Sequence, residues 1–117
     1  MEIVDIGARN FSQVMVIDDP GDCGASHEYR ICSVVDWFDK FGYVYFQKGP
    51  VKESGVNGCH QEDLLAIVIH RLQGFQTGPF KCRENALALT KLEEALHWLN
   101  HRTARRVSRG VEGMNVV

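Results

Sequence analysis

The 117-residue chain is 44% hydrophobic and 24% charged, with a formal net charge of −2. These values are ordinary for a globular protein and fit one domain of modest size. The net charge excludes a chain that binds polyanions through its overall charge, and no apolar run approaches the roughly 20 residues that a membrane span needs. The start carries no secretory signal, so we expect a cytoplasmic protein with reduced cysteines.

The charge is unevenly distributed along the chain. Residues 1–40 hold eight acids and three bases, whereas residues 101–110 hold four arginines and no acid. Such asymmetry favours a local anion site over a general nucleic-acid surface. The alternative is a solvated helix end, where cations complement the helix dipole.

The first fifty residues predict a small antiparallel sheet. Strand-like alternation or β-branched runs occupy residues 2–6, 11–17, 29–34 and 43–47. Residues 18–22 form a turn cluster, and residues 35–42 fit a short helical turn or a loop.

Residues 51–60 have the composition of a linker, with a turn at Asn57-Gly58. Two helices follow, over about 61–75 and 80–108, and the short connection at 76–79 makes them antiparallel neighbours. Residues 111–117 are left as a tail. The fold class is therefore α+β: a small N-terminal antiparallel β-sheet followed by a long C-terminal α-helical hairpin, within a single domain.

Apolar periodicity supports both helices. The second helix repeats leucine at positions 89, 92, 96 and 99, the seam of a helix pair. Pro79 fits its first helical position and Gly110 a place just beyond its end. The first helix carries more apolar surface than one partner helix covers, so we expect burial against a second chain: Leu64, Leu65, Ala66, Ile67, Val68, Ile69 and Leu72.

The end of the second helix is the candidate site. Arg102, Arg106 and Arg109 fall at i, i+4 and i+7 and share a helix face, with Arg105 beside them. Guanidinium groups match phosphate oxygens, and an anion or an acidic partner would relieve their repulsion. An exposed basic terminus is the alternative that periodicity does not separate from a site.

Motifs for catalysis are missing from the sequence. We find no nucleophile with an adjacent base and no phosphate-binding loop, so we expect no enzyme and no cofactor. Metal ligation is also not expected. His97 and His101 lack a third ligand, and the spacing of Cys23, His27, Cys59 and His60 matches no zinc pattern.

Several longer motifs resemble one phage protein family. They lie at residues 55–58, 62–68, 72–80, 82–89 and 92–99, and continue to 109–113. The resemblance is to the first-described anti-Thoeris family, whose C-terminal hairpin is shared with phage anti-CBASS sponges. It covers about residues 50–113.

The resemblance implies a function in the cytoplasm of an infected bacterial host. Such proteins capture cyclic ADP-ribose isomers made by TIR-domain immune proteins, and some hold cyclic di- or trinucleotides in separate pockets. They form hexamers built from dimers and sequester the signal without cleaving it. By position in the motifs, Phe75 would stack on adenine, Asn85 would hydrogen-bond ribose or base, and Arg102 would clamp a phosphate.

Further candidate residues are our own assignment. Arg105, Arg106 and Arg109 are candidates for the same or a neighbouring pocket, and a second pocket would use Gln76, Thr77, Gly78 and Arg83. Two other classes stay open. A nucleic-acid-binding helical module is disfavoured by the acidic balance, so we expect no long nucleic acid as a partner. A purely protein-binding hairpin would bind no small molecule.

Overall fold

The computed structural model describes residues 1–7 and 10–116, which form two compact units. The sheet unit comprises Met1–Gly49 and Ser54–Cys59, and the hairpin unit comprises Pro50–Glu53 and His60–Val117. Strands occupy the first and helices dominate the second, so the predicted α+β class is confirmed.

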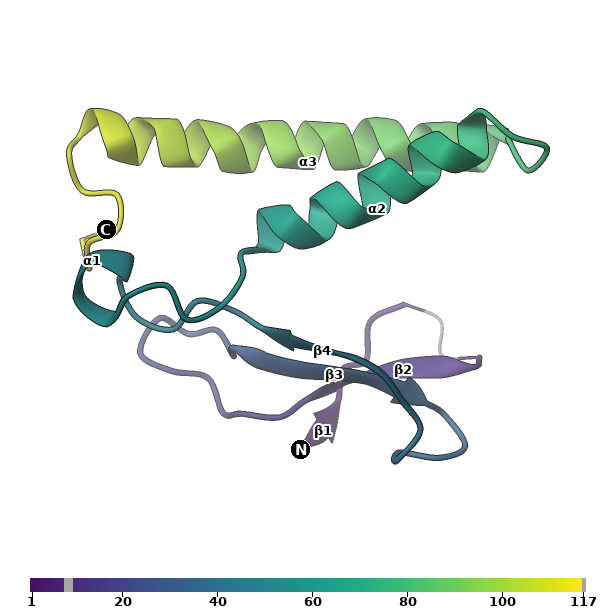
Figure 1. Ribbon diagram of the computed structural model, residues 1–117, viewed down its shortest axis with the longest axis horizontal. Helices are drawn as coiled ribbons and strands as arrows, with labels where there is room; N and C mark the ends of the chain where they lie inside the picture. The colour runs from purple at the N-terminus through teal and green to yellow at the C-terminus, as the bar shows by residue number, and fades with distance from the viewer. Residues whose placement is uncertain (8–9, 117) are drawn as a thin grey trace. The chain divides into compact units, whose positions relative to one another are not determined.

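The sheet unit holds four strands in the order β1-β2-β3-β4, each antiparallel to its neighbour (Figure 1). The predicted small antiparallel sheet is therefore confirmed, although the strand bounds differ from those expected. The strands are β1 Glu2–Ile3, β2 Ser12–Val16, β3 Glu28–Ser33 and β4 Lys40–Tyr45.

The largest difference concerns β4, which begins at Lys40, inside the segment expected to be a helical turn or loop. Its register against β3 shifts between Ile31, opposite Gly42, and Cys32, opposite Lys40. Phe41 is thus an extra residue, and a bulge of this kind breaks the alternation by which strands are recognised. The core of the sheet unit is small: among the described residues, Met15 and Cys32 are the side chains that are almost completely buried.

The expected turn at Asn57-Gly58 closes the sheet unit. The Asn57 side chain accepts from the Lys48 N–H at 2.8 Å and donates to the Lys48 carbonyl at 2.7 Å. A Cβ on Gly58 would lie 2.5 Å from the carbonyl carbon of Phe46, closer than real Cβ contacts come. Glycine is therefore required at this position by the close approach of two backbone segments.

The hairpin unit contains most of α1 Val51–Ser54, together with α2 Gln61–Gln76 and α3 Arg83–Ser108. The first of these is a single turn inside the segment expected to be a linker. Pro50 precedes it and Gly55 follows it with φ +73°. This pairing of proline before a helix and glycine after it was the overlooked signal.

Figure 1 shows α2 and α3 as antiparallel rods that meet at one corner, as predicted. The first begins at Gln61 as expected, but α3 begins at Arg83 rather than Phe80, so Pro79 is not its first residue. The Gln76 side chain explains the difference. It accepts from the Cys82 N–H at 3.1 Å and donates to the Cys82 carbonyl at 3.2 Å, which keeps residues 77–82 in the corner.

The predicted leucine seam of α3 is longer than the four leucines. Half-buried side chains recur along this helix at alternating spacings of four and three residues: Asn85, Leu89, Leu92, Leu96, Leu99, Thr103 and Arg106. This is the pattern of one helix packed along a partner. Asparagine and arginine therefore occupy the two ends of a stripe whose middle is leucine.

Much apolar surface of the hairpin unit stays uncovered. Ile69 is the one buried residue of α2, and α3 has none. Ile67 is 65% exposed and Val68, expected in the packed stripe, is 43% exposed. One helix partner buries one stripe, and these two side chains project away from it.

The last turn of α3 ends as predicted at Gly110, which has φ +72°. Its N–H donates to the Val107 carbonyl at 3.0 Å, and the Val111 N–H donates to the Arg106 carbonyl at 3.1 Å. This is the Schellman arrangement, and the left-handed residue within it favours glycine. None of the helices among the described residues has the length and apolar character to cross a membrane.

Candidate functional site

The three arginines predicted to share a helix face, and the fourth predicted beside them, do lie together. Arg102, Arg105, Arg106 and Arg109 line an open hollow of about 220 Å³ along the last turns of α3. Helical spacings of three and four residues bring these side chains to one end of the rod. The hollow is therefore a concentration of guanidinium groups, suited to an anion.

Arg106 plays a different part from its neighbours. Its side chain is only 13% exposed and its Nε donates to a Glu112 carboxylate oxygen at 3.1 Å. Its two terminal nitrogens donate to the carbonyls of Val111, Met114 and Val116. This guanidinium thus fastens residues 111–116 to the helix, and it forms one wall of the hollow.

The other three arginines are exposed and continue a second stripe on α3. Trp98, Arg102, Arg105 and Arg109 follow one another at spacings of four, three and four residues. This stripe lies beside the half-buried seam: Trp98, Arg102 and Arg105 each come one residue before a seam position. It places the ring of Trp98, which is 65% exposed, in line with the guanidinium groups.

Trp98 also belongs to a ring cluster that sequence reasoning did not identify. Its ring centroid lies 5.4 Å from that of His97 and 5.8 Å from that of His101. The two imidazoles stack at 6.5 Å. Trp98 and His101 are three residues apart and His97 and His101 are four, and these helical spacings were the signal for the cluster. Within residues 1–7 and 10–116, no group of three or more His, Cys, Asp or Glu side chains is arranged to hold a metal ion.

At the opposite end of the hairpin lies Phe75, half-buried near the corner. The Arg71 guanidinium carbon sits 4.9 Å from its ring centroid, and the Phe80 ring meets it edge-on at 6.5 Å. Arg71 was not among the predicted site residues, although its i, i+4 spacing from Phe75 was a usable signal. A guanidinium thus packs on the face of the Phe75 ring and brings a positive charge to this corner.

Asn85 lies within the first turn of α3 and is half-buried at the corner end of the seam. Its backbone N–H donates to the Sγ of Cys82, the N-cap residue, at 3.4 Å. The amide side chain thus begins the stripe that the leucines continue, instead of pointing fully into solvent. This position keeps it within the corner region that also holds Phe75.

The residues suggested for a second pocket are also at this corner. Gln76 uses both ends of its amide on the Cys82 backbone, and the Thr77 hydroxyl donates to the Gly74 carbonyl at 2.9 Å. Gly78 lies within the same turn, and Arg83 is exposed at the start of α3. Both neutral polar side chains are thus occupied within the turn, so Arg83 is the one charged side chain among these four residues.

The structure does not bring all predicted site residues together within one chain. Asn85 and Arg102 are separated by 17 residues of the continuous helix α3. At the helical rise of 1.5 Å per residue, this is about 25 Å along the axis. One small nucleotide therefore cannot contact the corner and the arginine hollow of the same chain.

Comparisons with known proteins agree with this architecture. The family model described as "Acb2/Tad1, hairpin domain" matches residues 41–104. A relative named "Thoeris anti-defense 1", from Bacillus phage SBSphiJ7, is 53% identical over 98 residues, which are 84% of this chain and 69% of that protein. The chain belongs to the Acb2/Tad1 hairpin family. The resemblance to anti-Thoeris proteins that the motifs indicated is thereby confirmed.

The Acb2/Tad1 match has informative bounds. It begins within β4, continues through α2 and ends at Ala104, before the last turn of α3. Phe75, Asn85 and Arg102 lie inside it, whereas Arg105, Arg106 and Arg109 lie beyond. The part of the chain that resembles other Acb2/Tad1 proteins thus includes both the corner and the first arginine of the hollow.

Proposed function

We propose that this protein is a phage anti-defence sponge. It binds cyclic ADP-ribose isomers produced by TIR-domain immune proteins and sequesters them without cleavage. Membership of the Acb2/Tad1 family and a relative named for anti-Thoeris defence support this function. The observation that carries it here is the gathering of four arginines around one hollow at the end of α3.

The chemistry of the hollow fits a pyrophosphate. Planar guanidinium groups donate paired hydrogen bonds to phosphate oxygens, and Arg102 and Arg105 are exposed to do so. Pockets that enclose a whole small ligand measure about 300–1,000 Å³. A hollow of about 220 Å³ therefore holds the phosphates and leaves the base and riboses to other walls.

A second copy of the chain supplies those walls in our proposal. Phe75 and Asn85 of one subunit meet Arg102 of another, because about 25 Å of helix separates them within one chain. The uncovered side chains of Ile67 and Val68 give such a pair an apolar contact surface. A dimer is the smallest assembly that completes the site, and dimers would assemble further into hexamers.

Energetic estimates support tight capture. Two or three charge-assisted hydrogen bonds contribute about 1.5–3 kcal/mol each, and stacking of a base contributes about 1–3 kcal/mol. Phe75 supplies one ring for stacking and the exposed Trp98, one turn before Arg102, supplies another. Nanomolar affinity requires about −12 kcal/mol, which these contacts and apolar burial can approach together.

Calorimetry with purified glycocyclic ADP-ribose isomers tests the proposal. We expect saturable binding and, after heat denaturation, chromatographic recovery of the unchanged ligand. Recovery of a hydrolysed product would indicate an enzyme instead. A gel shift with long single- or double-stranded nucleic acid that matched the affinity for the cyclic ligand would favour the nucleic-acid module.

A mixing experiment tests the shared site directly. Phe75→Ala and Arg102→Ala should each weaken binding strongly when purified alone. In a mixed dimer, one of the two sites combines the intact Phe75 of one variant with the intact Arg102 of the other. Co-refolding the two variants should therefore restore binding to part of the sites. If the mixture binds no better than either variant, the site is not shared between subunits.

Cyclic di- and trinucleotides are a second ligand class in our proposal, held at the corner where Arg83 is displayed. Gln76, Thr77 and Gly78 shape this pocket through the turn they form. Saturating the protein with a cyclic ADP-ribose isomer should leave binding of a cyclic dinucleotide unchanged. Competition between the two ligands would place them in one pocket.

A further inference from the structure

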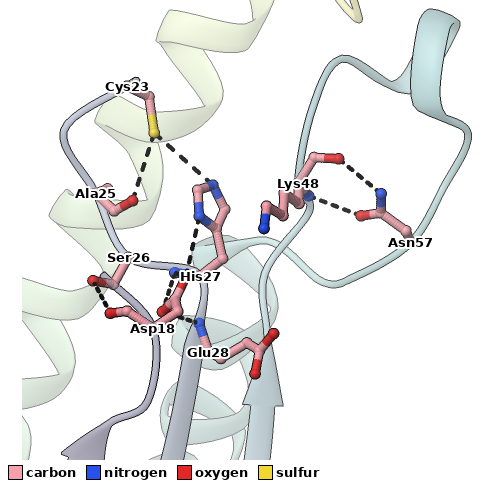
Figure 2. Close-up of polar contacts among 8 residues, drawn as sticks. All are labelled: Asp18, Cys23, Ala25, Ser26, His27, Glu28, Lys48 and Asn57. Atoms are coloured by element: carbon pink, nitrogen blue, oxygen red, sulfur yellow. Dashed lines mark hydrogen bonds and ion pairs between the residues drawn. The ribbon is translucent and has the colours of Figure 1, made fainter. Parts of the chain in front are cut away.

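The loop between β2 and β3 assembles three side chains that the proposed sponge function does not use. Figure 2 shows Cys23, His27 and Asp18 in a row within this loop. The Sγ of Cys23 lies 3.9 Å from Nε2 of His27, and Nδ1 of His27 lies 3.7 Å from a carboxylate oxygen of Asp18. Cys23 is exposed, whereas the two other side chains are only 15% and 20% exposed.

Backbone hydrogen bonds fix the row. The Asp18 carboxylate accepts from the N–H of His27 at 3.0 Å and from the N–H of Glu28 at 2.9 Å. The Ser26 hydroxyl donates to the Asp18 carbonyl at 3.0 Å, which ties the two ends of the loop together (Figure 2). The donated backbone bonds, that from Glu28 foremost, lower the pKa of Asp18 and keep it ionised at neutral pH.

The loop itself then holds the thiol beside the imidazole, with its Sγ 3.7 Å from the Ala25 carbonyl oxygen and 3.9 Å from Nε2 of His27. The Gly21 N–H donates to the Ala25 carbonyl at 3.2 Å, and the Gly24 N–H donates to the Gly21 carbonyl at 2.9 Å. A Cβ on Gly21 would lie 3.6 Å from Cε1 of the His27 ring, so this turn rests on the imidazole. Cys23 lies in this turn between Gly21 and Gly24, whose N–H groups both donate these hydrogen bonds.

We propose that Cys23 is a nucleophilic thiol and a modification site for small-molecule disulfides. A thiol within reach of an imidazole, with a carboxylate on the far side of that ring, is the arrangement that activates cysteine nucleophiles. His27 accepts the thiol proton at Nε2, and the ionised Asp18 stabilises the resulting imidazolium from the Nδ1 side. The reactive species is the thiolate.

The reaction is a balanced thiol–disulfide exchange. The Cys23 thiolate attacks one sulfur of the small disulfide, so a new S–S bond forms as the original one breaks. The second sulfur leaves as a thiolate and takes the proton that His27 carries. One protein thiol and one small disulfide give one mixed disulfide and one small thiol, with no further oxidant or reductant.

The test uses the full-length protein, glutathione disulfide as the probe and peptide mass spectrometry as the readout. Cys82 is also exposed and serves as an internal reference in the same sample. We expect His27→Gln to slow modification of Cys23 about a hundredfold relative to Cys82, the lower end of the effect of losing a general base. Asp18→Asn should slow Cys23 less, because it removes the charge but keeps an acceptor for the loop.

Loop disruption gives the opposite result and is therefore distinguishable. A loosened loop would expose the thiol more and raise the rate at Cys23, with a lowered melting temperature. An unchanged ratio of Cys23 to Cys82 modification in His27→Gln would overturn the proposal. So would a rate that rises in both variants.

Discussion

Arg106 and Glu112 form an ion pair, Nε to carboxylate oxygen 3.1 Å, across the turn that ends α3. The same guanidinium reaches carbonyls of residues 111–116, so one side chain fastens the whole C-terminal segment. The Lys52 N–H donates to the Gly113 carbonyl at 3.1 Å, which links this segment to α1 (Figure 1). The arginine cluster is thus divided between Arg106, which serves the C-terminal segment, and exposed members such as Arg102 and Arg105.

Arg106→Ala should release residues 111–116 and lower the free energy of unfolding. One hydrogen bond to a charged group contributes about 1.5–3 kcal/mol to stability. Because the partners of Arg106 return to water when the segment is released, we expect the variant to lose about the value of one such bond in total. Arg105→Ala is the matched control, with an expected change within about 0.5 kcal/mol because its side chain is exposed. Urea denaturation measures both, and hydrogen exchange should show faster amides after Gly110 in the first variant only.

Arg102→Ala should weaken ligand binding while leaving the melting temperature unchanged. Loss of one charge-assisted bond to a phosphate predicts about 10- to 150-fold weaker binding. Lys91→Ala removes another exposed cation of α3, one that pairs with Glu94 at 3.6 Å outside the hollow. Calorimetry on the two variants should separate them; equal affinities would contradict the role of the hollow.

Trp98→Ala should weaken binding of a ligand that carries a base next to the arginines. Stacking on an aromatic ring contributes about 1–3 kcal/mol, which predicts a loss of about 5- to 150-fold. Trp37→Ala, in the sheet unit and 48% exposed, is the control for losing an exposed indole. Quenching of tryptophan fluorescence on ligand addition should be lost in Trp98→Ala and should persist in Trp37→Ala.

Gln76→Ala should destabilise the helical hairpin, because the amide closes the corner on both backbone groups of Cys82. Two exposed neutral hydrogen bonds predict a loss of about 1 kcal/mol. Gln73→Ala, at an exposed position of α2, should change stability by less than about 0.5 kcal/mol. Thermal unfolding compares them, and equal melting temperatures would show that the corner does not depend on this side chain.

Asp18 gives a pH dependence of stability with a defined sign. Its pKa in the folded protein is lowered from the ordinary 3.8, chiefly by hydrogen bonds from the backbone N–H groups of Glu28 and His27. The carboxylate therefore stabilises the fold above pH 3.8, and this contribution is lost as the pH falls through the lowered value. The stability difference between the protein and Asp18→Asn should shrink on acidification; a difference that grows would contradict this.

Periodicity in the sequence was enough to predict the hairpin. Leu89, Leu92, Leu96 and Leu99 recur at the spacing of a packed helix, and Gly110 marks its end. The start of α3 was placed three residues too early, because the Gln76 amide holds Cys82 through a contact that no periodic pattern encodes. The bulge at Phe41 hid the start of β4 for a similar reason, since an inserted residue breaks alternation.

The sequence by itself determined the α+β class, the family motifs and the crowding of arginines at one end of a helix, because these follow from local spacing. Only the tertiary structure decided that Arg106 serves the C-terminal segment while Arg102 stays exposed, since that depends on how residues 111–116 fold back. The separation of Asn85 and Arg102 by about 25 Å already follows from the predicted helix over residues 80–108. A rigid rod fixes distances along its axis, and residues that share a motif need not share a place in space.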